Sequence, residues 1–204
     1  MKIRSLFIVL IGTLGVPIAA EGNDFDWYFI GGFTVFPEGT SVEVANTEGY
    51  GNRWGIGFQI NNFFGLEFAR DSAPAMNDSA IVKDFELDFE DTITNYDIKK
   101  AYNRFSSFVG TFTVPVSKST NIVGKVGYSN YSYRSKVEFE SNSGLQFSGK
   151  LEEDFGLTPT ASLGVEFPFG KGFGPKPAIE LAVTKVFEKE IESVWGTVSF
   201  LLRF

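Results

Sequence analysis

The chain has 204 residues, with 25 Asp and Glu against 18 Lys and Arg, and a formal net charge of −7. It contains no Cys and no His. The acidic balance argues against nucleic acid as a partner, because phosphate binding needs a basic surface. The missing Cys and His exclude disulfides, thiolate metal sites, thiol nucleophiles and the usual general base of a Ser hydrolase.

The first twenty residues, 1–20, are predicted to be a secretory signal peptide. A short basic start precedes an apolar run over 6–18, and the small residues at 19–20 resemble a cleavage site. The run is too short for a transmembrane helix, which needs about 20 apolar residues. The rest of the chain, 21–204, is expected to form one domain. It has no further long apolar run, so any membrane crossing has to be made by strands.

Alternation of apolar and polar residues, the pattern of a β-strand with two different faces, recurs eight times after the signal peptide. The predicted strands lie at 25–35, 53–60, 63–70, 97–115, 121–134, 155–167, 177–187 and 195–204. Short turns at 61–62, 117–120 and 169–175 alternate with longer polar segments, among them 71–96. Arms at 137–139 and 145–151 flank a polar tip at 141–144 and predict a hairpin raised above the barrel.

Each predicted strand has one strongly apolar face. In 63–70, Phe64, Leu66 and Phe68 share one face and Glu67 lies on the other. In a membrane barrel such an apolar face contacts lipid. A soluble barrel of the lipocalin type, with the apolar face inward, has the same period, so alternation alone fits both.

The last predicted strand carries aromatic and aliphatic residues at alternate positions, Phe200, Leu202 and Phe204. This ending resembles the C-terminal signal of bacterial outer-membrane β-barrels, which the barrel assembly machinery reads in that family. The segment 21–204 as a whole resembles the small OmpA/OmpX-type outer-membrane barrel family, through its strand pattern and this ending. The resemblance covers the barrel domain only, without the peptidoglycan-binding domain of full-length OmpA.

That resemblance favours the membrane barrel over the soluble one. It implies an all-β, eight-stranded, antiparallel up-and-down transmembrane β-barrel in the outer membrane of a Gram-negative bacterium. Both termini are then expected in the periplasm and the long loops outside the cell. The expected partners are outer-membrane lipid, lipopolysaccharide and the barrel assembly machinery, and the expected state is a monomer.

Six charged residues have the parity of the inward face: Arg53, Glu67, Lys125, Glu166, Glu180 and Arg203. The interior of an eight-stranded barrel is just wide enough for side chains to fill, and charges there must be paired or hydrated. Glu67, Lys125 and Glu180 are expected at similar heights. The cluster predicts either a salt-bridged plug or a gate whose pairs rearrange to pass small ions.

Four cations have outward parity beyond the apolar bands: Arg70, Lys100, Arg104 and Arg134. They predict either a solvated extracellular rim or contacts with lipopolysaccharide phosphates, because Arg pairs with phosphate through a fork of donors. The acidic segment 71–97 lacks the spaced ligands and central Gly of a calcium-binding loop. No metal or cofactor is therefore expected.

The sequence favours a non-enzymatic outer-membrane barrel with a largely plugged lumen, which serves envelope integrity or surface interaction through its extracellular loops. No nucleophile–base pair stands out. The alternative is a narrow pore for ions or small solutes, because inward Gly and Ser residues leave room for water.

Overall fold

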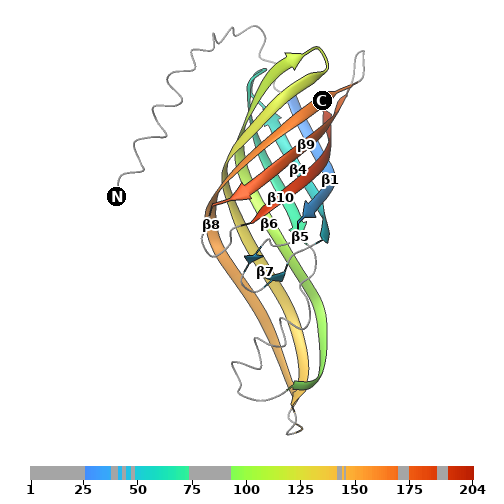
Figure 1. The fold of residues 1–204 in the computed structure, drawn as a ribbon, viewed down its shortest axis with the longest axis vertical. Coiled ribbons are helices and arrows are strands. Elements are labelled where there is room, and N and C mark those ends of the chain that lie inside the picture. The colour runs from blue at the N-terminus through green and yellow to red at the C-terminus, as the bar shows by residue number, and fades with distance from the viewer. Residues whose placement is uncertain are drawn as a thin grey trace, which may run out of the picture.

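The computed structural model describes residues 26–37, 41–42, 45–46, 49–73, 93–141, 144, 146–169, 175–187 and 193–204. Within these residues, eight long strands close into a barrel (Figure 1). They are β1 (Asp26–Phe36), β4 (Gly49–Gln59), β5 (Phe64–Ala73), β6 (Ile93–Ser117), β7 (Thr120–Ser141), β8 (Gln146–Pro168), β9 (Lys176–Val186) and β10 (Val194–Arg203). The predicted signal peptide lies outside the described residues.

The barrel is closed by its first and last strands. Each strand pairs antiparallel with the next along the chain, in the order β1-β4-β5-β6-β7-β8-β9-β10. β1 then pairs with β10 from Tyr28↔Arg203 to Val35↔Gly196. This closure satisfies backbone groups that an open sheet would leave unpaired at its edges. The predicted eight-stranded, antiparallel up-and-down barrel is confirmed.

The first predicted long loop, which follows 25–35, is partly wrong. It contains a two-stranded ladder of β2 (Ser41–Val42) and β3 (Ala45–Asn46), and β4 begins at Gly49 rather than at 53. The backbone ladder with β1 extends to Phe36↔Gly49. The residues at 49–52 are Gly, Tyr, Gly and Asn, so the ladder continues there without the alternation that sequence reasoning looks for.

The predicted loop at 71–96 is also too long. Residues 71–73 continue β5, which places Asp71 inside the barrel, and β6 already begins at Ile93. Pairing with β6 explains the extension, because Asp71 lies opposite Phe105 and Ala73 opposite Asn103. Residues 74–92, the rest of this predicted loop, lie outside the described residues.

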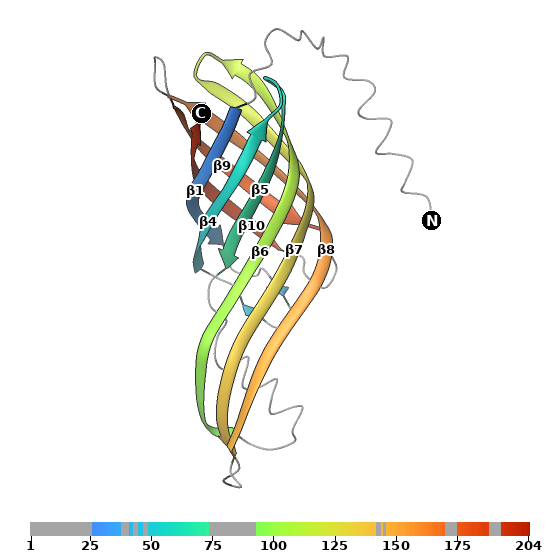
Figure 2. The ribbon, with the colours of Figure 1, turned by 180° about the vertical axis from the view of Figure 1, so that it is seen from behind.

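Three strands run far beyond the others at the end of the barrel that carries the long connections (Figure 2). β5 pairs with β6 only as far as Asn103, and β9 pairs with β8 only from Thr160. Beyond these points β6, β7 and β8 continue as a three-stranded ribbon. The ten residues 93–102 span about 30 Å at the rise of a strand. We call the end of the barrel from which this ribbon extends the long-loop end. The opposite end, which carries both described termini, is the short-turn end.

A close contact inside the barrel gives the first prediction. The ring of Tyr28 lies over Gly57, and a methyl group on Gly57 would come within 1.9 Å of Tyr28 Cζ. Gly57→Ala is therefore expected to displace Tyr28 and to lower the free energy of unfolding by about 1–3 kcal/mol. Denaturant unfolding of the refolded protein measures this loss. The control is Gly124→Ala, where the added methyl group meets nothing within 4 Å. Equal stability of the two variants would contradict the close packing of the Tyr28 ring over Gly57.

Candidate functional site: the barrel lumen

The outer wall of the barrel is apolar and exposed, whereas the lumen is polar. Exposed apolar side chains are found on all eight strands, among them Phe29, Ile56, Leu66, Phe108, Ile122, Leu163, Leu181 and Phe200. On the inner face, Glu67 is 1% exposed and Lys125 is 4% exposed. A soluble barrel of the lipocalin type would have the opposite arrangement, and a barrel with an apolar outer band is typical of outer membranes. The described chain is therefore a closed β-barrel with an apolar outer wall and a polar lumen, the arrangement that is usual for barrels in membranes.

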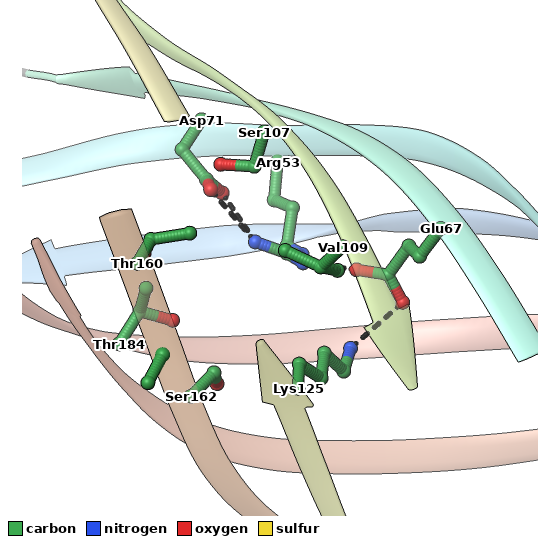
Figure 3. Close-up of a pocket in the computed structure, with 10 residues that line it drawn as sticks. Arg53, Glu67, Asp71, Ser107, Val109, Lys125, Thr160, Ser162 and Thr184 are labelled. Atoms are coloured by element: carbon green, nitrogen blue, oxygen red, sulfur yellow. Dashed lines mark hydrogen bonds and ion pairs between the residues drawn. The ribbon is translucent and has the colours of Figure 1, made fainter. Parts of the chain in front are cut away.

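Five charged residues, Arg53, Glu67, Asp71, Lys125 and Glu180, meet inside the lumen, and Figure 3 shows the first four of them. Arg53 Nη1 donates to both carboxylate oxygens of Asp71, at 2.8 and 2.7 Å, and Arg53 Nη2 donates to Glu67 Oε1 at 2.7 Å. Lys125 Nζ donates to Glu67 Oε2 at 2.8 Å and to Glu180 Oε1 at 2.7 Å. The five side chains thus form one continuous network, which we call the charge layer.

Strand register explains how the charge layer forms. Arg53 on β4 lies directly opposite Asp71 on β5, and Glu67 lies four residues before Asp71 on the same inward face. Lys125 comes from β7, two strands away from Glu67 on β5 and two strands away from Glu180 on β9. Its long side chain therefore links opposite parts of the wall. Sequence reasoning placed Asp71 in a loop and so missed it, although its parity matches that of Glu67.

Very little space remains around the charge layer. The cavity beside it has a volume of about 10 Å³ and is lined in addition by Ser107, Thr160, Ser162 and Thr184. A buried water needs roughly 10–15 Å³, so the cavity holds about one water molecule. The carboxylates of Glu67, Asp71 and Glu180 are all engaged by cations. The described part of the chain contains no group of acidic residues arranged to hold a metal ion.

The two remaining predicted charges form a separate pair near the short-turn end. Glu166 accepts hydrogen bonds from Asn121 Nδ2 at 2.9 Å and from Arg203 Nη1 at 3.1 Å, and Arg203 Nη2 also contacts its second oxygen. Glu166 lies opposite Glu180 in the β8–β9 register. The two neighbouring carboxylates avoid sharing a cation, because Glu180 binds Lys125 and Glu166 binds Arg203.

Apolar side chains fill the lumen on either side of the charge layer. Toward the short-turn end, Tyr28, Ile30, Ala178 and Leu201 form a buried cluster. The Tyr28 hydroxyl donates to Glu67 at 3.3 Å, and the Arg203 guanidinium lies 5.6 Å from the Tyr28 ring centroid. Tyr28 therefore connects the charge layer with the Glu166–Arg203 pair.

Toward the long-loop end, a second layer of side chains fills the lumen, and sequence reasoning missed it. Phe36, Phe105, Tyr131 and Trp195, from β1, β6, β7 and β10, are all buried, and we call them the aromatic layer. The ring centroids of Phe105 and Trp195 are 4.5 Å apart, those of Phe36 and Trp195 5.6 Å, and those of Phe105 and Tyr131 4.8 Å. Inward parity was the available signal, because Trp195 shares its face with Thr197 and Phe105 shares its face with Ser107.

Of the four predicted rim cations, Arg70, Arg104 and Arg134 lie on the neighbouring strands β5, β6 and β7, and each has a contact of its own. The Arg70 guanidinium lies 5.0 Å from the Trp54 ring centroid, and Arg104 Nε donates to Ser132 Oγ at 3.0 Å. Arg134 forms an exposed ion pair with Glu152. Lys100 belongs to β6, but its side chain lies outside what the structure describes.

The three residues of the predicted assembly signal lie on the last strand and its end. Phe200 is exposed on the outer wall. Phe204 N donates to Trp27 O at 2.8 Å, and the Phe204 ring meets the Phe29 ring edge-on with centroids 5.8 Å apart. The end of the described chain is therefore tied to β1. Reading of Phe200, Leu202 and Phe204 by the assembly machinery stays a prediction.

No protein-family model matches the chain, and no curated protein sequence does. Among solved structures, the chain is similar to Ail, the attachment invasion locus protein of Yersinia pestis, in complex with the heparin analogue sucrose octasulfate. The sequence identity is 10%, the similarity covers 88% of this chain and 99% of Ail, and the TM-score is 0.47. The chain is also similar to a major outer membrane protein from Thermus thermophilus, with 9% identity, a TM-score of 0.47 and coverage of 88% of this chain and 99% of that protein. For Neisserial surface protein A the identity is 8%, the TM-score is 0.38, and the similarity covers 88% of this chain and 94% of that protein.

No helix in the described part of the chain is long and apolar enough to cross a membrane.

Proposed function

We propose that the protein is a non-enzymatic, monomeric outer-membrane barrel whose lumen is plugged and whose long-loop end serves surface interaction or envelope integrity. The observation that carries this proposal is the filling of the lumen by two successive layers of different chemistry. The charge layer leaves space for about one water molecule. The aromatic layer adds four buried rings from four strands.

A catalytic function has little support in the lumen. The buried Ser107 and Ser129 hydroxyls are hydrogen-bonded to each other, with 2.6 Å between the oxygens, so Ser107 is not held against a carboxylate. The acidic side chains of the charge layer are neutralised by Arg53 and Lys125, and the chain has no His or Cys. These features support a structural role for the lumen charges.

Single-channel recording tests the plug. The refolded protein, checked for folding by a gel shift, is expected to give no steady conductance in a planar bilayer, because ions would have to cross both layers. The runner-up function, a narrow pore, is supported by the polar lining of the small cavity, which includes Ser162 and Thr184. Reproducible openings whose size changes in Glu67→Gln would establish the pore and overturn the plug.

The ribbon of β6, β7 and β8 supports the surface part of the proposal. It rises beyond the barrel wall, and its described side chains include the exposed ion pairs Arg134–Glu152 and Lys136–Glu138. A charged, hydrated ribbon suits contact with other surfaces outside the bilayer. This orientation puts the long-loop end outside the cell and both termini in the periplasm, as is usual for barrels whose long loops are extracellular.

Contact with lipopolysaccharide remains part of this proposal. Arg70 and Arg104 lie on the outer wall at the long-loop end of the apolar band, where phosphates of the outer leaflet would lie. Arg134, which already pairs with Glu152, suits the solvated rim better. Lipopolysaccharide binding by an Arg70→Ala, Arg104→Ala double variant distinguishes a phosphate contact from a solvated rim. Weaker binding is expected if these residues contact phosphate, and unchanged binding would mean that they only face solvent.

A further inference from the structure

The ribbon of β6, β7 and β8 contains two β-bulges, one on each of its outer strands. On β6, the two residues 100–101 stand opposite the single residue 135 of β7. On β8, the two residues 155–156 stand opposite residue 131, and Gly156 adopts a φ of +75° there. An extra residue shifts the alternation of a strand by one position. Each bulge therefore turns the residues beyond it to the opposite face of the ribbon.

The bulges change the face on which two lysines lie. Lys99 has the same parity as the buried Phe105 on β6, and Lys150 has the same parity as the buried Thr158 on β8. Uninterrupted alternation would place both lysines on the inward face. The observed register instead puts Lys99 and Lys150 directly opposite the exposed Lys136 of β7. Residues directly opposite each other share a face, so the three lysines form one cross-strand row, which we call the lysine row.

Three cations in one cross-strand row are unfavourable unless an anion joins them. Directly opposite residues have Cβ atoms about 4.5–5.5 Å apart, so like charges there weaken the pairing. Glu138 compensates one lysine, because its Oε1 lies 2.9 Å from Lys136 Nζ. Lys150 is exposed and forms no ion pair with any residue that the structure describes. The lysine row therefore keeps positive charge that its described neighbours do not neutralise.

The positive charge is confined to this one row. In the next row toward the barrel, Arg134 and Glu152 lie opposite each other and form an ion pair. In the next row toward the tip of the ribbon, Asp97 lies opposite Glu138. A long polyanion laid along the ribbon would meet these carboxylates on both sides of the lysine row. A compact anion, which contacts the lysine row alone, fits this charge pattern better.

A phosphate monoester has the chemistry that the lysine row requires. It carries about −1.5 to −2 charges at pH 7 and three strong acceptor oxygens. A lysine ammonium has three rotatable donors on a flexible four-carbon stem, so ammonium groups from neighbouring strands can converge on one phosphate. A carboxylate, with two oxygens and a single charge, would compensate the row less well.

The height of the lysine row indicates that this phosphate comes from the aqueous side. Tyr128 is exposed at the end of the apolar band of β7, and Lys136 lies eight residues further along the strand. Eight residues span about 27 Å, or about 20 Å along the membrane normal at the usual strand tilt. The lipid head-group layer is only about 5–8 Å deep on each side of the bilayer. The lysine row therefore lies beyond the head groups.

We propose that the lysine row binds a phosphate monoester of a soluble sugar phosphate at the long-loop end. This deepens the surface role proposed above, because it gives that end of the barrel a ligand class. The binding does not depend on the lumen. A protein that gives a silent bilayer but binds no sugar phosphate would keep its plug and lose only this site.

Phosphorus-31 NMR titration of glucose 6-phosphate with the refolded protein, in a nonionic detergent at low ionic strength, tests the site. We expect saturable binding that Lys150→Gln weakens about fivefold, the effect of one unit charge at contact in water. A Lys99→Gln, Lys150→Gln double variant should weaken it more than tenfold. The matched control is Lys118→Gln, an exposed lysine in the turn between β6 and β7 at the short-turn end. Absence of binding, or equal weakening by Lys118→Gln and Lys150→Gln, would overturn the site.

The ionisation of the ligand gives a second test. The second pKa of a phosphate monoester is about 6, so near pH 5 the ester has lost about one negative charge. Binding of glucose 6-phosphate is therefore expected to weaken about fivefold between pH 7.5 and pH 5, relative to glucose 6-sulfate, whose charge stays constant. The sulfate is the reference because titration of Asp97, Glu138 or Glu152 would affect both sugars alike. An equal pH response of the two sugars would contradict a phosphate site.

Phosphatidic acid distinguishes the source of the phosphate, because this lipid carries a phosphate monoester as its head group. Its retention by the protein in detergent, measured by native mass spectrometry, is expected to be the same for the wild type and Lys150→Gln. A greater loss of phosphatidic acid than of glucose 6-phosphate in Lys150→Gln would place the ligand in the bilayer and overturn the aqueous site.

Discussion

The substitution Lys125→Glu is expected to lower the free energy of unfolding by at least about 3–5 kcal/mol. Lys125 is 4% exposed and bridges Glu67 and Glu180, which are themselves 1% and 2% exposed. A carboxylate at position 125 would remove both ion pairs and bring a fourth carboxylate into the charge layer, beside Glu67, Asp71 and Glu180. The gain from the remaining Arg53 contacts cannot compensate, because Arg53 already pairs with Asp71.

Denaturant titration of the refolded variant in lipid vesicles measures this loss, and bilayer recording shows whether the weakened charge layer leaks. Lys136→Glu is the matched control, because Lys136 pairs with Glu138 on the ribbon, where both side chains are partly exposed. Its effect should stay within about 1 kcal/mol. A Lys125→Glu protein with wild-type stability and a silent bilayer would contradict both the plug and the gate.

The substitution Phe105→Ala is expected to lower the free energy of unfolding by about 3–5 kcal/mol, because it removes a ring from the middle of the aromatic layer. Phe105 is 1% exposed and its ring lies within 4.8 Å of the Tyr131 and Trp195 ring centroids. The neighbouring rings come from strands fixed by the closed backbone ladder, so they cannot collapse fully into the vacated space. Denaturant unfolding measures the loss.

Phe108 provides the control for this substitution on the same strand. It lies three residues further along β6, points outward and is 57% exposed. Lipid fills the space that its ring leaves, so Phe108→Ala should lower the free energy of unfolding by less than about 2 kcal/mol. We expect bilayers with Phe105→Ala to remain silent, because the charge layer still closes the lumen. A loss for Phe108→Ala that equals or exceeds that for Phe105→Ala would show that the aromatic layer does not stabilise the barrel.

The outward face of the strands could be predicted well from the sequence. Alternation in 63–70 placed Leu66 and Phe68 on one face and Glu67 on the other, and the structure has the first two exposed on the outer wall and Glu67 buried. The ends of strands were predicted less well where alternation fails. Gly49 and Gly51 join the ladder through backbone hydrogen bonds, which need no particular side chain.

The lumen was predicted in part. Parity indicated that Arg53 and Lys125 point inward, but parity fixes a face and not a partner. Arg203 and Glu166 have the same inward parity as Lys125, yet they form a separate pair, because the β8–β9 and β1–β10 registers set their heights. The aromatic layer was missed for a related reason. Its members are far apart in the chain, and only barrel closure brings β1, β6, β7 and β10 around one lumen.

The sequence by itself determined the number of barrel strands and the apolar face of each, because side chains alternate with a fixed period along every strand. Their up-and-down order was implied by the resemblance to outer-membrane barrels. Tertiary structure alone decided which inward residues meet. Partners such as Lys125 and Glu180 are 55 residues apart, and their contact depends on the stagger of strands that lie between them and around the barrel.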